Sequence, residues 1–176
     1  MKEFKELVLI DEIVLQSKIA QRANERLQAT QESLDRLEVW CSIQSILVAT
    51  GNISKILWPI NKNNKLRGER LRQILKVEET NILSDRTFRN HFEHYDERIE
   101  ELFNNASSLT YRDLAMNPSF RGASIANVDR GYNSFNNTLI FRGEVLDLNN
   151  IFKALEEILN NCKPYTKLES FLSSNT

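Results

Sequence analysis

Apolar residues recur at helical spacing through the first third of the chain. Residues 1–58 hold no proline and a single glycine, and their apolar side chains return every three to four positions. This pattern predicts two long helices with a break near Thr30, because a threonine can cap the start of a helix. The second helix should end at Trp58, since the residue before a proline is disfavoured in the α region.

Two further helices are expected after a polar loop. One covers about 65–78, and the other begins at Ser84 or Asp85, either of which could cap it, and runs to about Asn105. On a wheel of about 100° per residue, the large apolar side chains of this last helix fall into one sector about 100° wide. They are Phe88, Phe92, Tyr95, Ile99, Leu102 and Phe103. We expect this sector to face the core.

The pattern changes beyond Asn105, where Asn, Ser, Gly and Pro residues predict surface loop with short pieces of structure. Two short strands are expected around Arg142 and Gly143, and they would form a small β-hairpin. Helical spacing resumes at Leu148 and continues to Pro164, which predicts a C-terminal helix. The chain is therefore expected to be mainly α.

The length of 176 residues fits a single domain. We place a helical core bundle over about 1–105 and the loop, hairpin and final helix over about 106–176. Lys and Arg number 23 and Asp and Glu 24, a net charge of −1, so bulk electrostatics favours neither nucleic acid nor membrane. Residues 1–15 lack the apolar run of a signal peptide or a membrane span, which predicts a cytoplasmic protein without membrane association.

One basic cluster stands out against this neutral background. It surrounds a single acidic residue, Glu69, and consists of Lys62, Lys65, Arg67, Arg70, Arg72 and Lys76. Such a cluster is either a solvated loop and helix surface or a source of sequence-independent contacts to RNA phosphates. If RNA binds there, its affinity should fall as the salt concentration rises.

The chain's only two histidines lie in the stretch RNHFEHYDER, residues 89–98. His91 flanks the apolar sector, about 70° from its centre, which predicts a partly buried ring hydrogen-bonded at one nitrogen. His94 lies about 130° from that centre, on a polar face with Asn90 and Glu97. This polar face could be a solvated helix surface, a subunit contact or one side of a cleft.

An imidazole and a guanidinium together suit phosphodiester chemistry. The imidazole exchanges a proton near neutral pH, and the guanidinium matches the geometry of phosphate oxygens. RNA carries its own nucleophile, the 2′-hydroxyl, so the reaction needs no metal-bound water. Residues five apart lie about 140° apart on a helix, so Arg89 and His94 of one chain would not converge on one phosphate. A second copy across a two-fold axis could supply the missing side, which predicts a homodimer.

A metal site is the competing interpretation of these histidines. His91 and His94 are close enough along a helix to approach one ion together with Asp96 or Glu97. Arg98 would repel a divalent cation there, and the chain holds no third histidine. We therefore expect neither a metal nor another cofactor.

The stretch RNHFEH resembles the R-x4-6-H motif of the HEPN family (higher eukaryotes and prokaryotes nucleotide-binding). Arg89 matches the motif arginine, Asn90 the polar residue that commonly follows it, and His94 the motif histidine. The resemblance implies an antiparallel helical bundle and a homodimer with the Arg/His pair in its interface cleft. It also implies metal-independent cleavage of RNA, with Arg89, Asn90 and His94 as the catalytic residues. It extends from the second helix to Asn105 and does not explain the hairpin or the last helix.

The family includes toxins of defence systems, so the resemblance also implies a toxin or defence effector with an antitoxin protein as its partner. Some of these toxins carry a tyrosine two positions after the histidine, where a partner nucleotidyltransferase modifies it. Here that position is Asp96, so this form of regulation is not carried over. Three hypotheses stay open: a metal-independent endoribonuclease, a non-catalytic module that binds a nucleotide, RNA or protein, and a structural dimerisation module.

Overall fold

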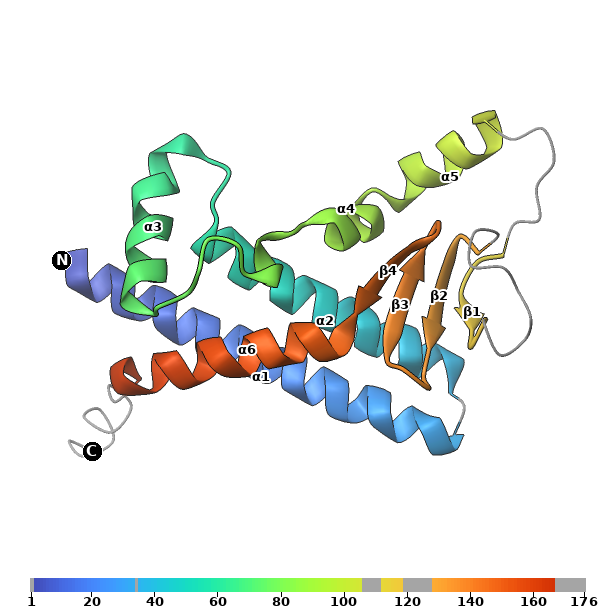
Figure 1. Ribbon diagram of the computed structural model, residues 1–176, viewed down its shortest axis with the longest axis horizontal. Helices are drawn as coiled ribbons and strands as arrows, with labels where there is room; N and C mark the ends of the chain where they lie inside the picture. The colour runs from blue at the N-terminus through green and yellow to red at the C-terminus, as the bar shows by residue number, and fades with distance from the viewer. Residues whose placement is uncertain (1, 34, 106–111, 119–127, 167–176) are drawn as a thin grey trace.

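The protein is mostly helical, with a small sheet at one end of the helices (Figure 1). The computed structural model describes residues 2–33, 35–105, 112–118 and 128–166. The mainly helical class expected from the sequence is confirmed.

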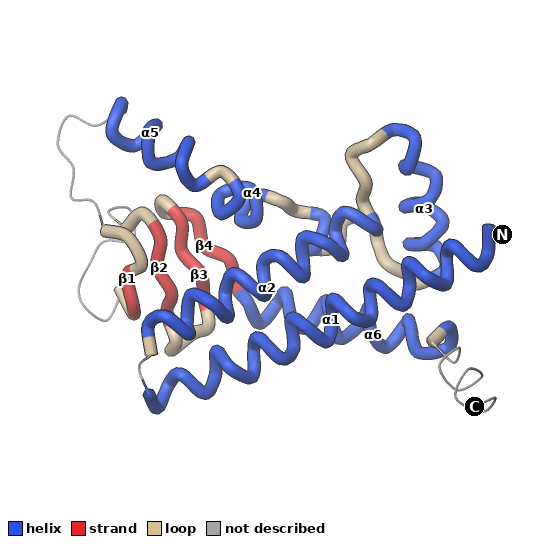
Figure 2. Tube along the Cα trace, turned by 180° about the vertical axis from the view of Figure 1, so that it is seen from behind, coloured by secondary structure: helices blue, strands red, loops and turns tan. Residues whose placement is uncertain are grey.

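The longest helices form an antiparallel hairpin. Helix α1 (Lys2–Ser33) runs along α2 (Arg36–Leu57), and α6 (Leu148–Cys162) packs along α1 (Figures 1 and 2). Each of these helices buries one apolar side, as its helical spacing predicts. They form the frame on which the shorter elements rest.

The turn of the hairpin lies at Asp35. Its carboxylate accepts a hydrogen bond from the backbone N–H of Glu38 at 3.0 Å, which satisfies a donor in the first turn of α2. Thr30 instead lies inside α1, where its buried hydroxyl donates to the carbonyl of Leu27 at 2.6 Å. The expected break near Thr30 is therefore wrong, because the threonine bonds back within its own helix and the aspartate supplies the cap.

Helix α3 (Lys65–Ile74) lies at the end of the hairpin opposite the sheet (Figure 1). It is shorter than the helix expected over about 65–78. The chain leaves the helical region at Lys76, whose φ of 51° is left-handed. The sequence carries no glycine at this position to indicate such an end.

The helix expected from Ser84 or Asp85 onward is two helices in the structure. They are α4 (Thr87–Glu93) and α5 (Tyr95–Asn105), with His94 between them at φ −113° and ψ 41°. The carboxylate of Asp85 accepts hydrogen bonds from the backbone N–H and hydroxyl of Thr87, which hold its pKa below the usual value. The start is thus close to the expected one, but the single continuous helix is wrong.

The sheet has four strands in the order β1-β2-β3-β4. They are β1 (Ala115–Met116), β2 (Arg130–Asn133), β3 (Thr138–Phe141) and β4 (Glu144–Asp147), with β1 parallel to β2 and the other pairs antiparallel. Arg142 and Gly143 join β3 to β4 with φ of 46° and 86°, a left-handed turn that favours glycine. Strands β3 and β4 are the antiparallel pair around Arg142 and Gly143, and β1 and β2, in the region expected to be surface loop with short pieces of structure, extend it to a four-stranded sheet.

Two apolar clusters make up most of the described core. One lies between α1, α2, α3 and α6, and the other joins the first half of α2 to the sheet at Tyr132. Phe88 and Phe92 of α4 pack against this second cluster as partly buried side chains. Phe103 is 58% exposed, so the sector expected to face the core does so at α4 but not at this end of α5. The break at His94 changes the direction of the chain, and α5 extends away from the helical frame (Figure 1).

Candidate functional site

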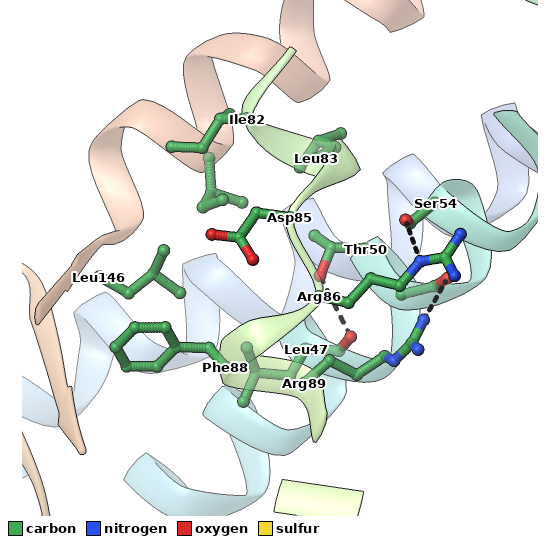
Figure 3. Close-up of a pocket in the computed structure, with 12 residues that line it drawn as sticks. Leu47, Thr50, Ser54, Ile82, Leu83, Asp85, Arg86, Phe88, Arg89 and Leu146 are labelled. Carbon is green, nitrogen blue, oxygen red and sulfur yellow. Dashed lines mark hydrogen bonds between the residues drawn. The ribbon is translucent and has the colours of Figure 1, made fainter. Parts of the chain in front are cut away.

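Helix α4 rests on α2, and the side chain of Arg89 lies between the two helices (Figure 3). This side chain is only 11% exposed. Its guanidinium donates to the carbonyl of Gly51 at 3.4 Å and to the side-chain oxygen of Asn90 at 3.2 Å. Its Nε lies 3.3 Å from a carboxylate oxygen of Glu93, an ion pair without hydrogen-bond alignment. Three neighbours therefore fix the position of the guanidinium.

Arg89 reaches this position because Gly51 has no side chain. A Cβ at Gly51 would overlap Cδ of Arg89. Glycine in the middle of a helix costs about 1 kcal/mol relative to alanine, so its presence in α2 calls for a packing reason. The close approach of the arginine stem supplies that reason.

We expect Gly51→Ala to lower the free energy of unfolding by about 1–3 kcal/mol, because the new methyl group overpacks the contact with Arg89. In an open helix the same substitution would instead raise stability by roughly 0.5–1 kcal/mol. Urea unfolding followed by circular dichroism measures the difference.

The matched control is Gly51→Ala in an Arg89→Ala background. The stem that clashes is then absent, so the added methyl group should be stabilising in that background. Equal effects of Gly51→Ala with and without the arginine would contradict the contact.

His94 follows α4 and carries an accessible ring. Its side chain is 53% exposed, and Nδ1 lies 3.5 Å from Oε1 of Glu97. Its backbone N–H donates to the carbonyl of Asn90 at 3.0 Å, and its carbonyl accepts from the N–H of Arg98 at 3.1 Å. Hydrogen bonding therefore continues across the break, and the imidazole can meet a ligand from solvent.

Asn90 connects the two motif residues. Its side chain accepts from Arg89, and its backbone carbonyl accepts from His94. Within the described part of the chain, no hydrogen bond or ion pair joins Arg89 directly to His94. The guanidinium of Arg89 contacts α2, while half of the imidazole of His94 faces solvent. For one phosphate to contact both side chains, a second protein surface must complete the site or the carboxylate of Glu93 must move away from Arg89.

His91 has a packing role. Its ring stacks on Phe141 with centroids 4.2 Å apart and an angle of 11° between planes. Nε2 lies 3.3 Å from a carboxylate oxygen of Glu144, while Nδ1 is buried without a hydrogen bond to a described residue. The expectation of a partly buried ring bonded at one nitrogen is confirmed. The two histidines do not share a site.

The arginines of the basic cluster are engaged within the fold. Arg67 donates to two carbonyls at the end of α2, both at 3.2 Å. Arg70 forms an ion pair with Glu6 of α1 at 3.0 Å. Arg72 is buried and donates to the carbonyl of Leu57. These contacts hold α3 against the hairpin. Arg67 and Arg72 bind the end of α2 because the last carbonyls of a helix have no partners within it.

A smaller basic surface remains for an anionic partner. Lys62, Lys65 and Lys76 are exposed. Contact with RNA stays a prediction for Lys62, Lys65, Arg67, Arg70 and Arg72, although the fold already gives the three guanidinium groups other partners. RNA would have to displace these contacts to reach the arginines, whereas Lys62 and Lys65 are exposed.

Arg86 is a second guanidinium of the site that sequence reasoning missed. It lines the same cavity as Arg89, of about 40 Å³, and Figure 3 shows both side chains extending along α2. Its Nε lies 3.5 Å from the hydroxyl of Ser54, and its Nη2 donates to the carbonyl of Trp58. Burial and the charge of Arg89 lower the pKa of Arg86. The spacing of three residues between the arginines could have indicated a shared helix face.

No family model matches this sequence, and neither does a curated protein or a solved structure. Among the described residues, no group of three or more His, Cys, Asp or Glu side chains could hold a metal ion. None of the helices described here is both long enough and apolar enough to cross a bilayer.

Proposed function

We propose that the protein is a metal-independent endoribonuclease that uses His94 and Arg89. The observation that carries the proposal is the exposed imidazole of His94, which follows α4 directly. The backbone N–H of His94 donates to Asn90, and the side chain of Asn90 accepts from the guanidinium of Arg89. The resemblance to the R-x4-6-H motif supports the same pair. RNA is the substrate class, because its 2′-hydroxyl supplies the nucleophile that this pair lacks.

In the proposed reaction the 2′-oxygen bonds to the adjacent phosphorus, and the bond from phosphorus to the 5′-oxygen breaks. A neutral His94 takes the proton of the 2′-hydroxyl, and a protonated His94 gives one to the leaving 5′-oxygen. Arg89 stabilises the negative charge that develops on the non-bridging oxygens. The products are a 2′,3′-cyclic phosphate and a 5′-hydroxyl, so the atoms balance without added water.

One imidazole cannot make both proton transfers in the same step. A second copy across a two-fold axis beside α4 would supply the second imidazole and the missing side of the cleft. The RNA phosphate would take the place of the Glu93 carboxylate beside Arg89, since a guanidinium pairs with either anion. The proposed active form is therefore a homodimer in which substrate exchanges with Glu93.

The test is cleavage of a single-stranded RNA in the presence of EDTA. We expect products ending in a 2′,3′-cyclic phosphate, and we expect a matched strand with 2′-O-methyl groups throughout to stay intact. The reason is that the methyl group removes the nucleophile and leaves the phosphate unchanged. Loss of cleavage on chelation, or cleavage of the methylated strand, would exclude the proposed chemistry.

A non-catalytic RNA-binding module is the second candidate, and the low exposure of Arg89 favours it. A guanidinium that stays paired with Glu93 can support the fold without reaching a phosphate. The unmodified RNA and the 2′-O-methylated RNA separate the two candidate functions. Salt-sensitive binding of both RNAs, with neither of them cleaved, would point to this module.

A further inference from the structure

One face of α1 is exposed along much of its length and is apolar in its first half. Phe4, Val8 and Leu15 are 64%, 51% and 50% exposed. With the exposed residues between and after them they form a run separated by alternating steps of four and three: Phe4, Val8, Asp11, Leu15, Lys18 and Arg22, here called the α1 face. Steps of four and three are the spacing at which one helix pairs with another.

The opposite side of α1 is already buried in the fold. Ile10, Ile13 and Ala20 are at most 1% exposed and belong to the core cluster shared with α2 and α6. The apolar residues of the α1 face are therefore additional to those that the fold uses. Beside them, α1 and α6 border a groove of about 590 Å³ lined in part by Val8, Leu15 and Leu159.

The charges on this face indicate which partner fits. Asp11 and Lys18 stand on opposite sides of Leu15 along the helix, and both line the groove toward α6. Neither forms an ion pair with another described residue. Both charges are thus available to a partner that carries the opposite charges in the reverse order.

We infer that the α1 face pairs antiparallel with the α1 face of a second copy of this chain. With the two-fold axis beside Leu15, Asp11 of each chain faces Lys18 of the other, because this two-fold axis places the α6-side edge of one helix opposite the same edge of its partner. Val8 then lies against the aliphatic part of Arg22 of the other chain. A parallel arrangement would oppose like charges at both positions.

This surface is distinct from the one on which the proposed function depends. In both views α2 lies between α1 and α4 (Figures 1 and 2). Variants on α1 therefore leave Arg89 and His94 unchanged. Sedimentation of variants on α1 tests the pairing, whereas RNA cleavage by variants at Arg89 and His94 tests the proposed function.

Sedimentation velocity of the full chain over a range of concentrations tests the pairing. We expect the parent chain to associate through the α1 face, and we expect Leu15→Glu to weaken that association at least about tenfold, since a central apolar contact becomes a pair of like charges. The variant should then sediment as a monomer, or as the dimer joined beside α4 on which the proposed function depends. Leu66→Glu is the matched control: its leucine is 75% exposed on α3, outside the α1 face, and it should dimerise as the parent chain does.

Charge reversal gives the sharper result. Asp11→Lys alone and Lys18→Asp alone should each weaken the homodimer, because like charges then meet twice. Mixing the two variants should restore the association of the parent chain, since both cross-chain pairs are again of opposite charge. A parent chain that stays monomeric, a Leu15→Glu variant that sediments as the parent does, or a mixture that sediments no faster than the separate variants would overturn the inference.

Discussion

Substituting His94 with alanine is expected to lower the rate of RNA cleavage by roughly 10²–10⁴-fold, the contribution of a positioned acid or base to a proton transfer. The ring is half exposed, and Glu97, whose carboxylate lies 3.5 Å from Nδ1, has most of its own side chain exposed. Removing the imidazole therefore leaves no packing void, and the loss should be one of chemistry. Initial rates on one RNA in EDTA measure it.

The chain offers a matched control in its other histidine. His91→Phe keeps an aromatic ring stacked on Phe141 and removes both ring nitrogens. It should retain cleavage, whereas His94→Ala should retain the fold, measured as an unchanged unfolding midpoint. If His91→Phe abolished cleavage and His94→Ala spared it, the roles assigned to the two histidines would be reversed.

The parts of the fold that the sequence predicts well are those with long one-sided periodicity. The spacing in α2 and α6 persists over several turns, and proline follows each of them closely. The break at His94 leaves no such trace, because the backbone hydrogen bonds on either side continue and no glycine or proline marks it. Strands β1 and β2 also leave no pattern in the sequence, since two to four residues are too few to show an alternation of apolar and polar side chains.

The site depends on contacts between segments distant in the chain. The motif places Arg89 and His94 on neighbouring turns, but the direction of the arginine is decided by Gly51, which lies in another helix. Proximity of this kind cannot be inferred from spacing within α4. The role of Gly51 could still have been suspected, because a glycine inside a strongly periodic helix costs stability unless something packs against it.

The basic cluster shows a physical effect that the sequence could have indicated. Pro59 ends α2 and leaves its last carbonyls without partners. Arg67, Arg72 and Arg86 donate to carbonyls over residues 55–58, so the end of one helix engages three guanidinium groups. Cations near a helix C-terminus are favoured for this reason before any ligand is considered. A count of positive charge therefore overestimates what is left for RNA.

Replacing Phe141 with alanine is expected to lower the free energy of unfolding by about 3–5 kcal/mol, the usual cost of removing a fully buried phenyl ring. Phe141 is fully buried, with the ring of His91 stacked on it and the ring of Phe92 at 6.2 Å between centroids. It thus joins the sheet to two residues of α4. Urea unfolding measures the change, and Val145→Ala, on the neighbouring strand at 52% exposure, should stay within about 0.5 kcal/mol.

The same variant separates a folding role from a positioning role for the sheet. Where Phe141→Ala remains folded, α4 keeps its contacts with α2 through Arg89 but loses its aromatic support from β3. Cleavage should then fall below that of Val145→Ala at equal folded fraction, because His94 stands at the end of the helix that the sheet supports. Unchanged cleavage would show that α2 alone positions α4. If Phe141→Ala lowered the free energy of unfolding by no more than Val145→Ala does, the packing of the sheet against α4 would be contradicted.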